Sequence, residues 1–248
     1  MFTKESIDPV NWDVSDVIRT TGPVTAAVAK LLNNKTHQLR LFFGTGRYFY
    51  KIGQIVDDAS AQRRLYGVKD PCYTASGLNS ACTTTVSEGS LGAAFTSSDT
   101  NTDGSTDAFG NINADGSSDV DGWYIPLQQA FGSNGAERVI TDPLATTIGV
   151  VFFTTAKPST DICTFGGKSY IWAIRYDTGG TVPAGVLKGK AMQQLSTGAI
   201  SEVSLSDAFD YQGNRRTGPG EGMPPVDQSL NVPIPPKPIG KILHMQKK

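Results

Sequence analysis

Short apolar runs that end at Gly, Pro or Asp recur along the chain and restrict it to β structure. In the clearest run, residues 169–176, Tyr170, Trp172 and Ile174 alternate with a second set at 171, 173 and 175, which is the period of two of a strand, and Asp177 and two glycines then supply a turn. Helix signals are weak, and only residues 24–32 are ambiguous. The pattern predicts an all-β protein, a propeller or a sandwich. The other strand-like runs are 38–43, 123–127, 138–140 and 149–155.

The chain of 248 residues is long enough to bury a core, and 38% of it is hydrophobic. Its character changes at residue 213, where Gly and Pro become frequent and the core-forming capacity falls. We therefore expect residues 1–212 to form the β domain and residues 213–248 an extended tail, in which 241–246 could add a closing strand. No apolar run approaches the roughly 20 residues that cross a bilayer.

The net charge of −1 is a cancellation between two unlike parts of the chain. From Asp70 to Glu137 the sequence has nine acidic residues and no Lys or Arg. The rest has 22 basic against 14 acidic residues. The bulk charge does not favour a nucleic-acid or anionic-membrane binder, and it directs attention to the acidic stretch.

Two adjacent units of twelve residues, 99–110 and 111–122, form a tandem repeat with six identical positions. Both are of the type D-x-[DN]-x-D-G-x-x-D, with Asn in the first place of the second unit; in this pattern alternate residues direct oxygens to one centre and Gly at the sixth place allows a sharp turn. The pattern predicts a pair of calcium loops in an insertion at 99–122. Each unit has Gly at the twelfth place, where a full helix-loop-helix site has a bidentate Glu, so further ligands must come from elsewhere.

In the first unit the expected ligands are Asp99, Asn101, Asp103, the carbonyl of Ser105, and Asp107. In the second they are Asn111, Asn113, Asp115, the carbonyl of Ser117, and Asp119 or Asp121. Because the carboxylates of the first unit repel one another unless a cation enters, we expect calcium there, and weaker binding at the second unit. A solvated flexible loop is the alternative.

Cys72 and Cys82 bracket a short polar segment, and a disulfide between them would restrict the unfolded chain. Free thiols remain the alternative. Zinc is disfavoured, because the spacing is not C-x-x-C and both histidines are far away in sequence. Cys163 is left without an assigned partner.

Several short blocks follow one another along the chain. They are 11–12, 22–26, 41–48, 62–70, 122–127, 137–139 with Pro143, 151–155, Pro158, 161–163, 166–167 and Ser169. This series resembles the C-terminal β-propeller of PilY-type proteins, the tip-associated adhesins and assembly factors of bacterial type IV pili. The resemblance covers residues 11 to about 180, and the tail more weakly.

The resemblance implies a modified, partial propeller with quinoprotein-like blades at the end of a longer exported protein. It implies calcium-dependent pilus biogenesis and adhesion, a location at the pilus tip or cell surface, and minor pilins or a surface receptor as partners. The chain offers about four or five blades at roughly 40–45 residues each. We therefore expect it to be a C-terminal fragment, a reading frame cut at its start, or a split protein completed by an N-terminal partner chain, with the export signal in the missing N-terminal part. An incomplete propeller would leave an exposed strand edge that must be paired.

No catalytic constellation is evident, so we expect no enzymatic activity. His37 and His244 lack a nucleophile nearby in sequence, and Asp57 and Asp58 are adjacent and would face opposite sides of a strand. The Gly44-Thr45-Gly46 run is not a phosphate loop, because strand and not helix is expected at 47–50. The sequence at 176–179 resembles the strand-end turn of quinoprotein blades, but an ordinary turn is the simpler interpretation. A surface propeller that binds carbohydrate or protein, and a quinoprotein-like enzyme remnant, are the alternative functions.

Overall fold

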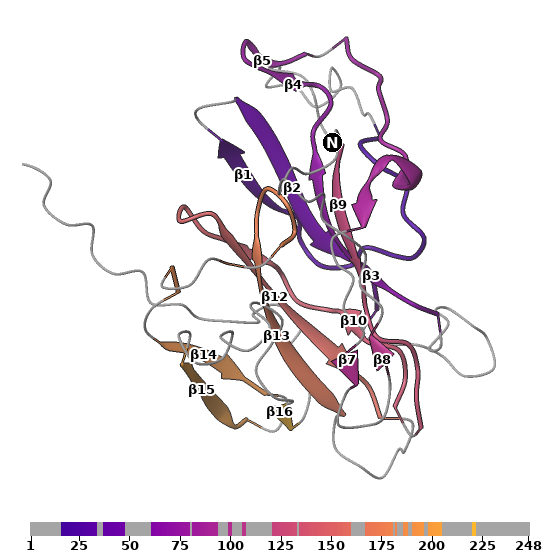
Figure 1. Ribbon diagram of the computed structural model, residues 1–248, viewed down its shortest axis with the longest axis vertical. Helices are drawn as coiled ribbons and strands as arrows, with labels where there is room; N and C mark the ends of the chain where they lie inside the picture. Colours follow the sequence, from indigo (N-terminus) through magenta and orange to yellow (C-terminus); the bar gives the residue numbers. More distant parts are fainter. Residues whose placement is uncertain are drawn as a thin grey trace, which may run out of the picture.

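The computed structural model describes residues 16–33, 37–47, 61–79, 81–93, 99–100, 106–107, 121–132, 134–159, 167–180, 182, 186–187, 190–195, 198–204 and 220–221. Strands dominate these ranges, and the helical element within them is one short 3-10 turn, η2 (Glu88–Ser90). The predicted all-β class is therefore confirmed (Figure 1).

The first sheet has five strands in the order β1-β2-β3-β9-β6, and all of its neighbours are antiparallel except β6 and β9. The β1–β2 hairpin turns at His37, which adopts a positive φ of 52°. The strands are β1 (Ala29–Asn33), β2 (Gln38–Gly44), β3 (Arg64–Lys69), β9 (Gly122–Pro126) and β6 (Gly92–Ala93).

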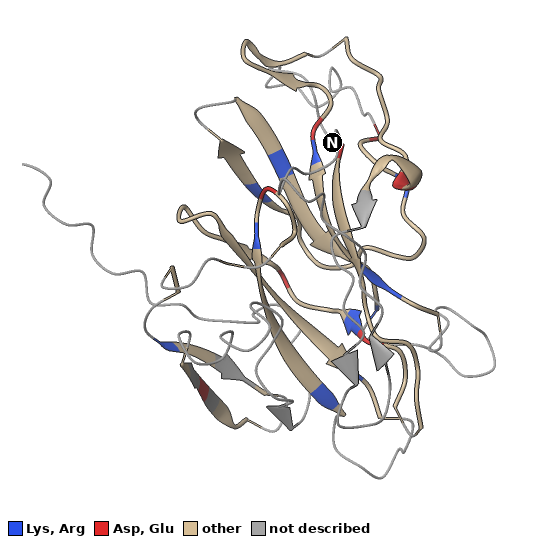
Figure 2. Cartoon of the chain, viewed as in Figure 1, with Lys and Arg blue, Asp and Glu red and all other residues tan. Residues whose placement is uncertain are grey.

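The second sheet is built around the long hairpin of β12 and β13, in which eight residue pairs run from Val150↔Arg175 to Lys157↔Lys168. Its order is β10-β12-β13-β16, and β11 also pairs with β12. The two long strands carry charge only at their ends (Figure 2). The strands are β10 (Arg138–Val139), β11 (Leu144–Ala145), β12 (Val150–Lys157), β13 (Lys168–Arg175) and β16 (Gly220–Glu221).

Three two-stranded ribbons complete the described structure. They are β4 (Tyr73–Thr74) with β5 (Gly77–Leu78), β7 (Asp99–Thr100) with β8 (Thr106–Asp107), and β14 (Lys190–Gln194) with β15 (Ile200–Ser204).

The two large sheets share one central core. Trp123 of the first sheet meets Phe153 of the second edge to face, with 6.5 Å between ring centroids. Burial of aromatic and branched side chains from both sheets supplies the main favourable free energy of this contact. The buried members are Phe42, Leu65, Trp123, Ile125 and Leu127 on one side, and Val139, Val151, Phe153, Trp172 and Ile174 on the other.

The outer face of each large sheet is covered as well. On the first sheet, Phe43, Tyr66 and Val68 pack against Val86 and Leu91. On the second sheet, a further cluster brings β12 and β13 together with Val182, Leu187 and Ala191. Because layers lie on both faces, every residue of β12 is buried, and alternation does not show in its burial.

The sheets approach most closely where β2 ends. A Cβ on Gly44 would lie 2.1 Å from Cγ2 of Val139, so only glycine fits there. The backbone N–H of Val139 donates to the carbonyl of Thr45 at 3.0 Å, and Gly46 adopts a φ of +147°. The Gly44–Gly46 run is thus a crossing point between the sheets.

The predicted strands at 38–43, 123–127, 138–140, 149–155 and 169–176 are confirmed with shifts of one or two residues at their ends. The expectation of strand at 47–50 is wrong for Arg47, because β2 ends at Gly44, and residues 48–50 lie outside the described part. The ambiguous run contains strand β1. From the tail, Gly220 and Glu221 pair with the start of β13; the rest of 213–248 lies outside the described residues. The described strands form stacked sheets and no closed ring of blades.

Candidate functional site

The insertion with the predicted calcium loops leaves the first sheet after β6 and returns to it at β9. Gly92 pairs with Trp123 and Ala93 with Tyr124, so the strands on either side of the insertion are neighbours in the first sheet. Asp121 stands just before β9, and its carbonyl accepts the backbone N–H of Lys69 at 2.9 Å. The insertion is therefore joined directly to β9, which carries Trp123 of the central core.

The first loop is described only at its ends. The backbones of Asp99 and Asp107, its first and ninth positions, pair across β7 and β8, and Thr100 pairs with Thr106. The chain thus reverses between the first and the last predicted ligand. The other predicted ligands of this loop, Asn101, Asp103 and Ser105, lie outside the described residues.

The second loop lies outside the described part except for its end. Its ligands there are Asn111, Asn113, Asp115, Ser117 and Asp119, and only Asp121 is described, with a half-buried side chain. Within the described ranges, no three His, Cys, Asp or Glu side chains group closely enough to hold a metal ion. The calcium loops therefore stay a prediction from the sequence.

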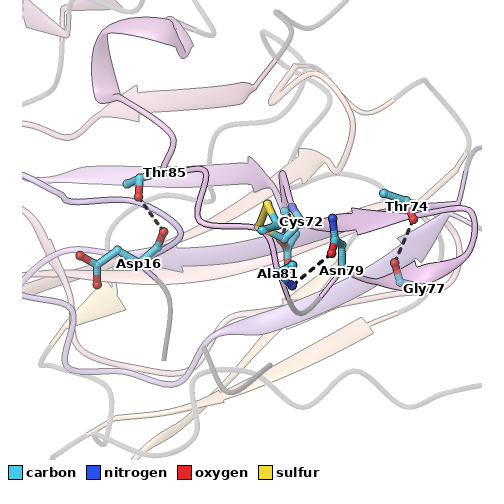
Figure 3. The surroundings of a disulfide bond; sticks show 9 residues. Asp16, Cys72, Thr74, Gly77, Asn79, Ala81 and Thr85 are labelled. Atoms are coloured by element: carbon cyan, nitrogen blue, oxygen red, sulfur yellow. Dashed lines mark hydrogen bonds between the residues drawn. A yellow bond between two sulfur atoms is a disulfide. The ribbon is translucent and has the colours of Figure 1, made fainter. Parts of the chain in front are cut away.

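Cys72 and Cys82 form a disulfide that closes a loop around the β4–β5 ribbon (Figure 3). Hydrogen bonds between residues two apart in sequence fix the same loop: the N–H of Cys72 donates to Oδ1 of Asp70 at 2.9 Å, and the N–H of Ala81 donates to Oδ1 of Asn79 at 3.1 Å. Cys72 is buried. The disulfide predicted from the sequence is therefore present, and the alternatives at this pair, free thiols and a zinc site, are excluded. Cys163 lies outside the described residues.

Glu88 joins three segments of the chain on the outer side of the first sheet. Its carboxylate accepts hydrogen bonds from the N–H and the hydroxyl of Thr21, both at 2.8 Å, and from the hydroxyl of Tyr66. Nη1 of Arg64 approaches it to 3.0 Å, and the Arg64 guanidinium lies 4.7 Å from the ring centroid of Tyr124.

These contacts shift two pKa values. Burial of the Glu88 carboxylate opposes its ionisation, but the hydrogen bonds from Tyr66 and Thr21 and the charge of Arg64 outweigh burial, so the pKa of Glu88 lies below its usual value. Burial, followed by the hydrogen bond to Glu88, raises the pKa of Tyr66 far above its usual value. Glu88 is therefore an ionised anchor and Tyr66 a permanent donor.

A second carboxylate, Glu137, is fully buried between the strands of the second sheet. It accepts hydrogen bonds from the hydroxyl of Thr155 and, at 3.2 Å, from Nε1 of Trp172. Nearby, Nζ of Lys157 donates to Oε1 of Gln128 at 3.2 Å, and both of these side chains are buried too. These hydrogen bonds link β12 and β13 to the segments that carry Gln128 and Glu137 inside the core.

The turn at 176–179 fastens the second sheet to the first. The carbonyl of Tyr176 accepts a hydrogen bond from Nε1 of Trp123 at 3.2 Å, and its hydroxyl accepts one from Nδ2 of Asn33 at 2.9 Å. The Arg40 guanidinium lies 6.0 Å from the centroid of the Tyr176 ring. Burial lowers the pKa of Arg40, and the nearby charge of Asp177 opposes that shift.

The sequence did not reveal these networks, because their partners lie far apart in it: Glu88 is 67 residues from Thr21, and Asn33 is 143 residues from Tyr176. The residues weighed for catalysis are not brought together in the described part. His37 is exposed at a hairpin turn, and Asp57, Asp58 and His244 lie outside the described residues.

Comparison of the chain with models of known protein families, with curated proteins and with solved structures found no match in any of the three. No helix in the described ranges is long and apolar enough to span a membrane.

Proposed function

We propose that the chain is a calcium-binding β-propeller portion of a type IV pilus tip-associated protein of the PilY type, without enzymatic activity. The observation that carries the proposal is the tandem [DN]-x-N-x-D-G repeat at 99–122, with the backbones of Asp99 and Asp107, the first and ninth positions of its first unit, paired. Closely spaced carboxylate and amide oxygens around a Gly turn are the ligand pattern that calcium prefers.

The sheet architecture supports the propeller part of the proposal. Blades of a propeller are four-stranded antiparallel sheets that stack on both faces. Each of the two five-stranded sheets contains a series of four antiparallel strands, β1-β2-β3-β9 beside β6 and β10-β12-β13-β16 beside β11, and the two series stack over the central core. The β14–β15 ribbon follows along the chain, and Ala191 of β14 packs on the outer face of the second sheet, as a strand of a third blade would.

The turn at 176–179 supports quinoprotein-like blades. It ends the third strand of one four-stranded series and bonds to Trp123 in the last strand of the preceding series. In a ring of blades, such a contact would repeat from blade to blade and hold neighbours in register.

The disulfide supports a location outside the reducing cytosol, because disulfides persist mainly in exported proteins. At the cell surface the proposed partners are minor pilins at the pilus tip, a surface receptor, and an N-terminal chain that completes the propeller. Calcium would neutralise the acidic insertion, and the anchoring of that insertion on β9 would carry the change into the central core.

Thermal unfolding with and without calcium tests the metal-dependent half of the proposal. A ligand that binds the folded state at 100 times its dissociation constant stabilises it by about 2.7 kcal/mol. Calcium should therefore raise the melting temperature of the native chain, while a chelator reverses the rise and magnesium gives less. Asp103→Ala should reduce the response, whereas Asp16→Ala, which removes an exposed carboxylate paired with Arg19, should leave it unchanged.

The pilus half is tested separately, by locating the protein in the cells that make it. Antibodies against the chain should label the cell surface, and the protein should appear in the sheared pilus fraction and co-purify with minor pilins. Recovery in the cytosol alone would contradict this half, whatever the calcium result.

A further inference from the structure

A pocket of about 490 Å³ opens on the outer face of the first sheet. Its floor is formed by Leu41 and Phe43 of β2, and its walls by Val17 and Ile18. This volume falls within the roughly 300–1,000 Å³ of pockets that bind small molecules. Six of the nine lining side chains are apolar, and the other three are Asp16, Thr20 and Lys30, so the pocket favours a ligand with an apolar body and a polar end.

The segment that forms one wall is fastened at several points. Ile18 bridges to Val86, and the N–H of Val86 donates to the carbonyl of Val17 at 2.7 Å. The hydroxyl of Thr85 donates to the carbonyl of Asp16 at 3.0 Å (Figure 3). On the floor, Phe43 stacks on Tyr66 with 5.1 Å between ring centroids. The pocket is therefore preformed, and binding costs little ordering of the protein.

The mouth of the pocket exposes apolar side chains to solvent. Val24 is 39% exposed and Val28 is 48% exposed, and both line the pocket. Large apolar side chains that gather at one exposed place mark a binding site more often than singly scattered ones do.

Two charged residues line the pocket, Asp16 and Lys30, and only the charge of Asp16 is paired with an opposite charge within the described residues. The carboxylate of Asp16 is held by Arg19, whose Nε and Nη2 donate to it at 3.0 and 2.8 Å. Lys30 lies opposite Leu41 in the β1–β2 ladder, and its side chain is exposed. Among the ion pairs of the described residues, none involves Lys30. The charge that the pocket offers a ligand is thus the ammonium of Lys30.

We propose that this pocket binds an amphipathic anion: a compact apolar chain inserted between Ile18, Val28 and Phe43, with a carboxylate at its end that pairs with Nζ of Lys30. A positively charged or neutral head on the same chain would lose the pairing. The site is distinct from the predicted calcium loops, and binding does not require calcium.

Calorimetric titration of the full chain with octanoate, 1-octanol and octylammonium tests the proposal, because the three probes share one apolar chain. An exposed ion pair contributes about a two- to fivefold change in affinity. Octanoate should saturate one site and bind about two- to fivefold more tightly than octanol, and octylammonium should bind more weakly than octanol. Chelation of calcium should not change the order.

Variants then identify the residue responsible. Lys30→Ala should remove the preference for octanoate over octanol, and Lys30→Arg should retain it. Val28→Asp, at a half-exposed position that tolerates a polar side chain, should weaken octanoate binding. Lys190→Ala is the matched control, because that exposed lysine pairs with Glu202 on a different sheet. Absence of saturable octanoate binding, equal affinity for all three probes, or an unchanged preference in Lys30→Ala would overturn the proposal.

Discussion

The indole Nε1 of Trp123 donates a hydrogen bond to the backbone carbonyl of Tyr176 at 3.2 Å and so ties a strand of the first sheet to the turn that ends a strand of the second. Both groups lie beside the central core, where Trp123 is almost fully buried. Trp123 therefore contributes both packing and a hydrogen bond to the contact between the sheets, and its replacement should weaken both.

Replacing Trp123 by Phe should destabilise the protein by about 2–4 kcal/mol, because the smaller ring leaves a cavity and the carbonyl of Tyr176 loses its donor. Tyr176→Phe removes only the hydroxyl that accepts from Asn33, and about 1 kcal/mol is expected. Chemical denaturation of both variants measures the difference. Equal losses would show that the indole contact does not fasten the sheets.

Gly67 should not tolerate a methyl group. It lies opposite Trp123 in the β3–β9 ladder, and a Cβ there would lie 2.2 Å from Cε2 of the indole. Gly67→Ala should therefore cost about 1–3 kcal/mol through displacement of the ring. Gly89→Ala is the control, because its nearest contact would be at an ordinary 3.6 Å. Similar melting temperatures for the two variants would contradict the predicted contact between Gly67 and the Trp123 ring.

The disulfide should stabilise the protein chiefly by restricting its unfolded chain. The loop between Cys72 and Cys82 spans ten positions in sequence, for which about 2–3 kcal/mol is expected. Reduction, or the double change Cys72→Ser with Cys82→Ser, should lower the free energy of unfolding by that amount. Mass spectrometry of the unreduced protein provides the check, since two alkylatable thiols at these positions would refute the bond.

Glu88 should make stability depend on acid pH. Its folded pKa lies below the unfolded value of about 4.3, so its contribution is present above that pH and is lost as the pH falls through the folded pKa. Denaturation between pH 7 and 3 should show the advantage of the native protein over Glu88→Gln shrinking below about pH 4.3.

Glu202→Gln provides the control for this pH series, because Glu202 pairs with Lys190 at an exposed site and its loss should matter little at any pH. A constant difference between the native protein and Glu88→Gln across the series would contradict the role of Glu88 as an ionised anchor.

The sequence indicated the long strands well, because alternation and flanking turn residues are local signals. Strand β1 was ambiguous for a physical reason: its Ala, Lys and Leu residues suit a helix, and pairing with β2 decides its conformation. Alternation also could not predict that β12 is buried on both faces, because that depends on which layers pack against it.

The same distinction between local sequence signals and long-range packing applies to the candidate sites. The disulfide could be proposed from the sequence because its cysteines are close neighbours along the chain. The pocket could not be predicted from the sequence, because Ile18 and Phe43 are far apart along the chain. They line one pocket in the folded protein, where Ile18 forms a bridge to Val86. The calcium loops were indicated by spacing alone, and their metal remains a prediction.

Equilibrium dialysis of the native chain against radioactive calcium counts the ions that the tandem repeat binds. We expect up to two per chain, the tighter at the first loop with its three carboxylates, Asp99, Asp103 and Asp107. Asp103→Ala should remove the tighter ion and leave the binding of octanoate intact. A chain that binds no calcium at millimolar concentration, or that binds it equally well after Asp103→Ala, would show that the repeat is not a calcium site.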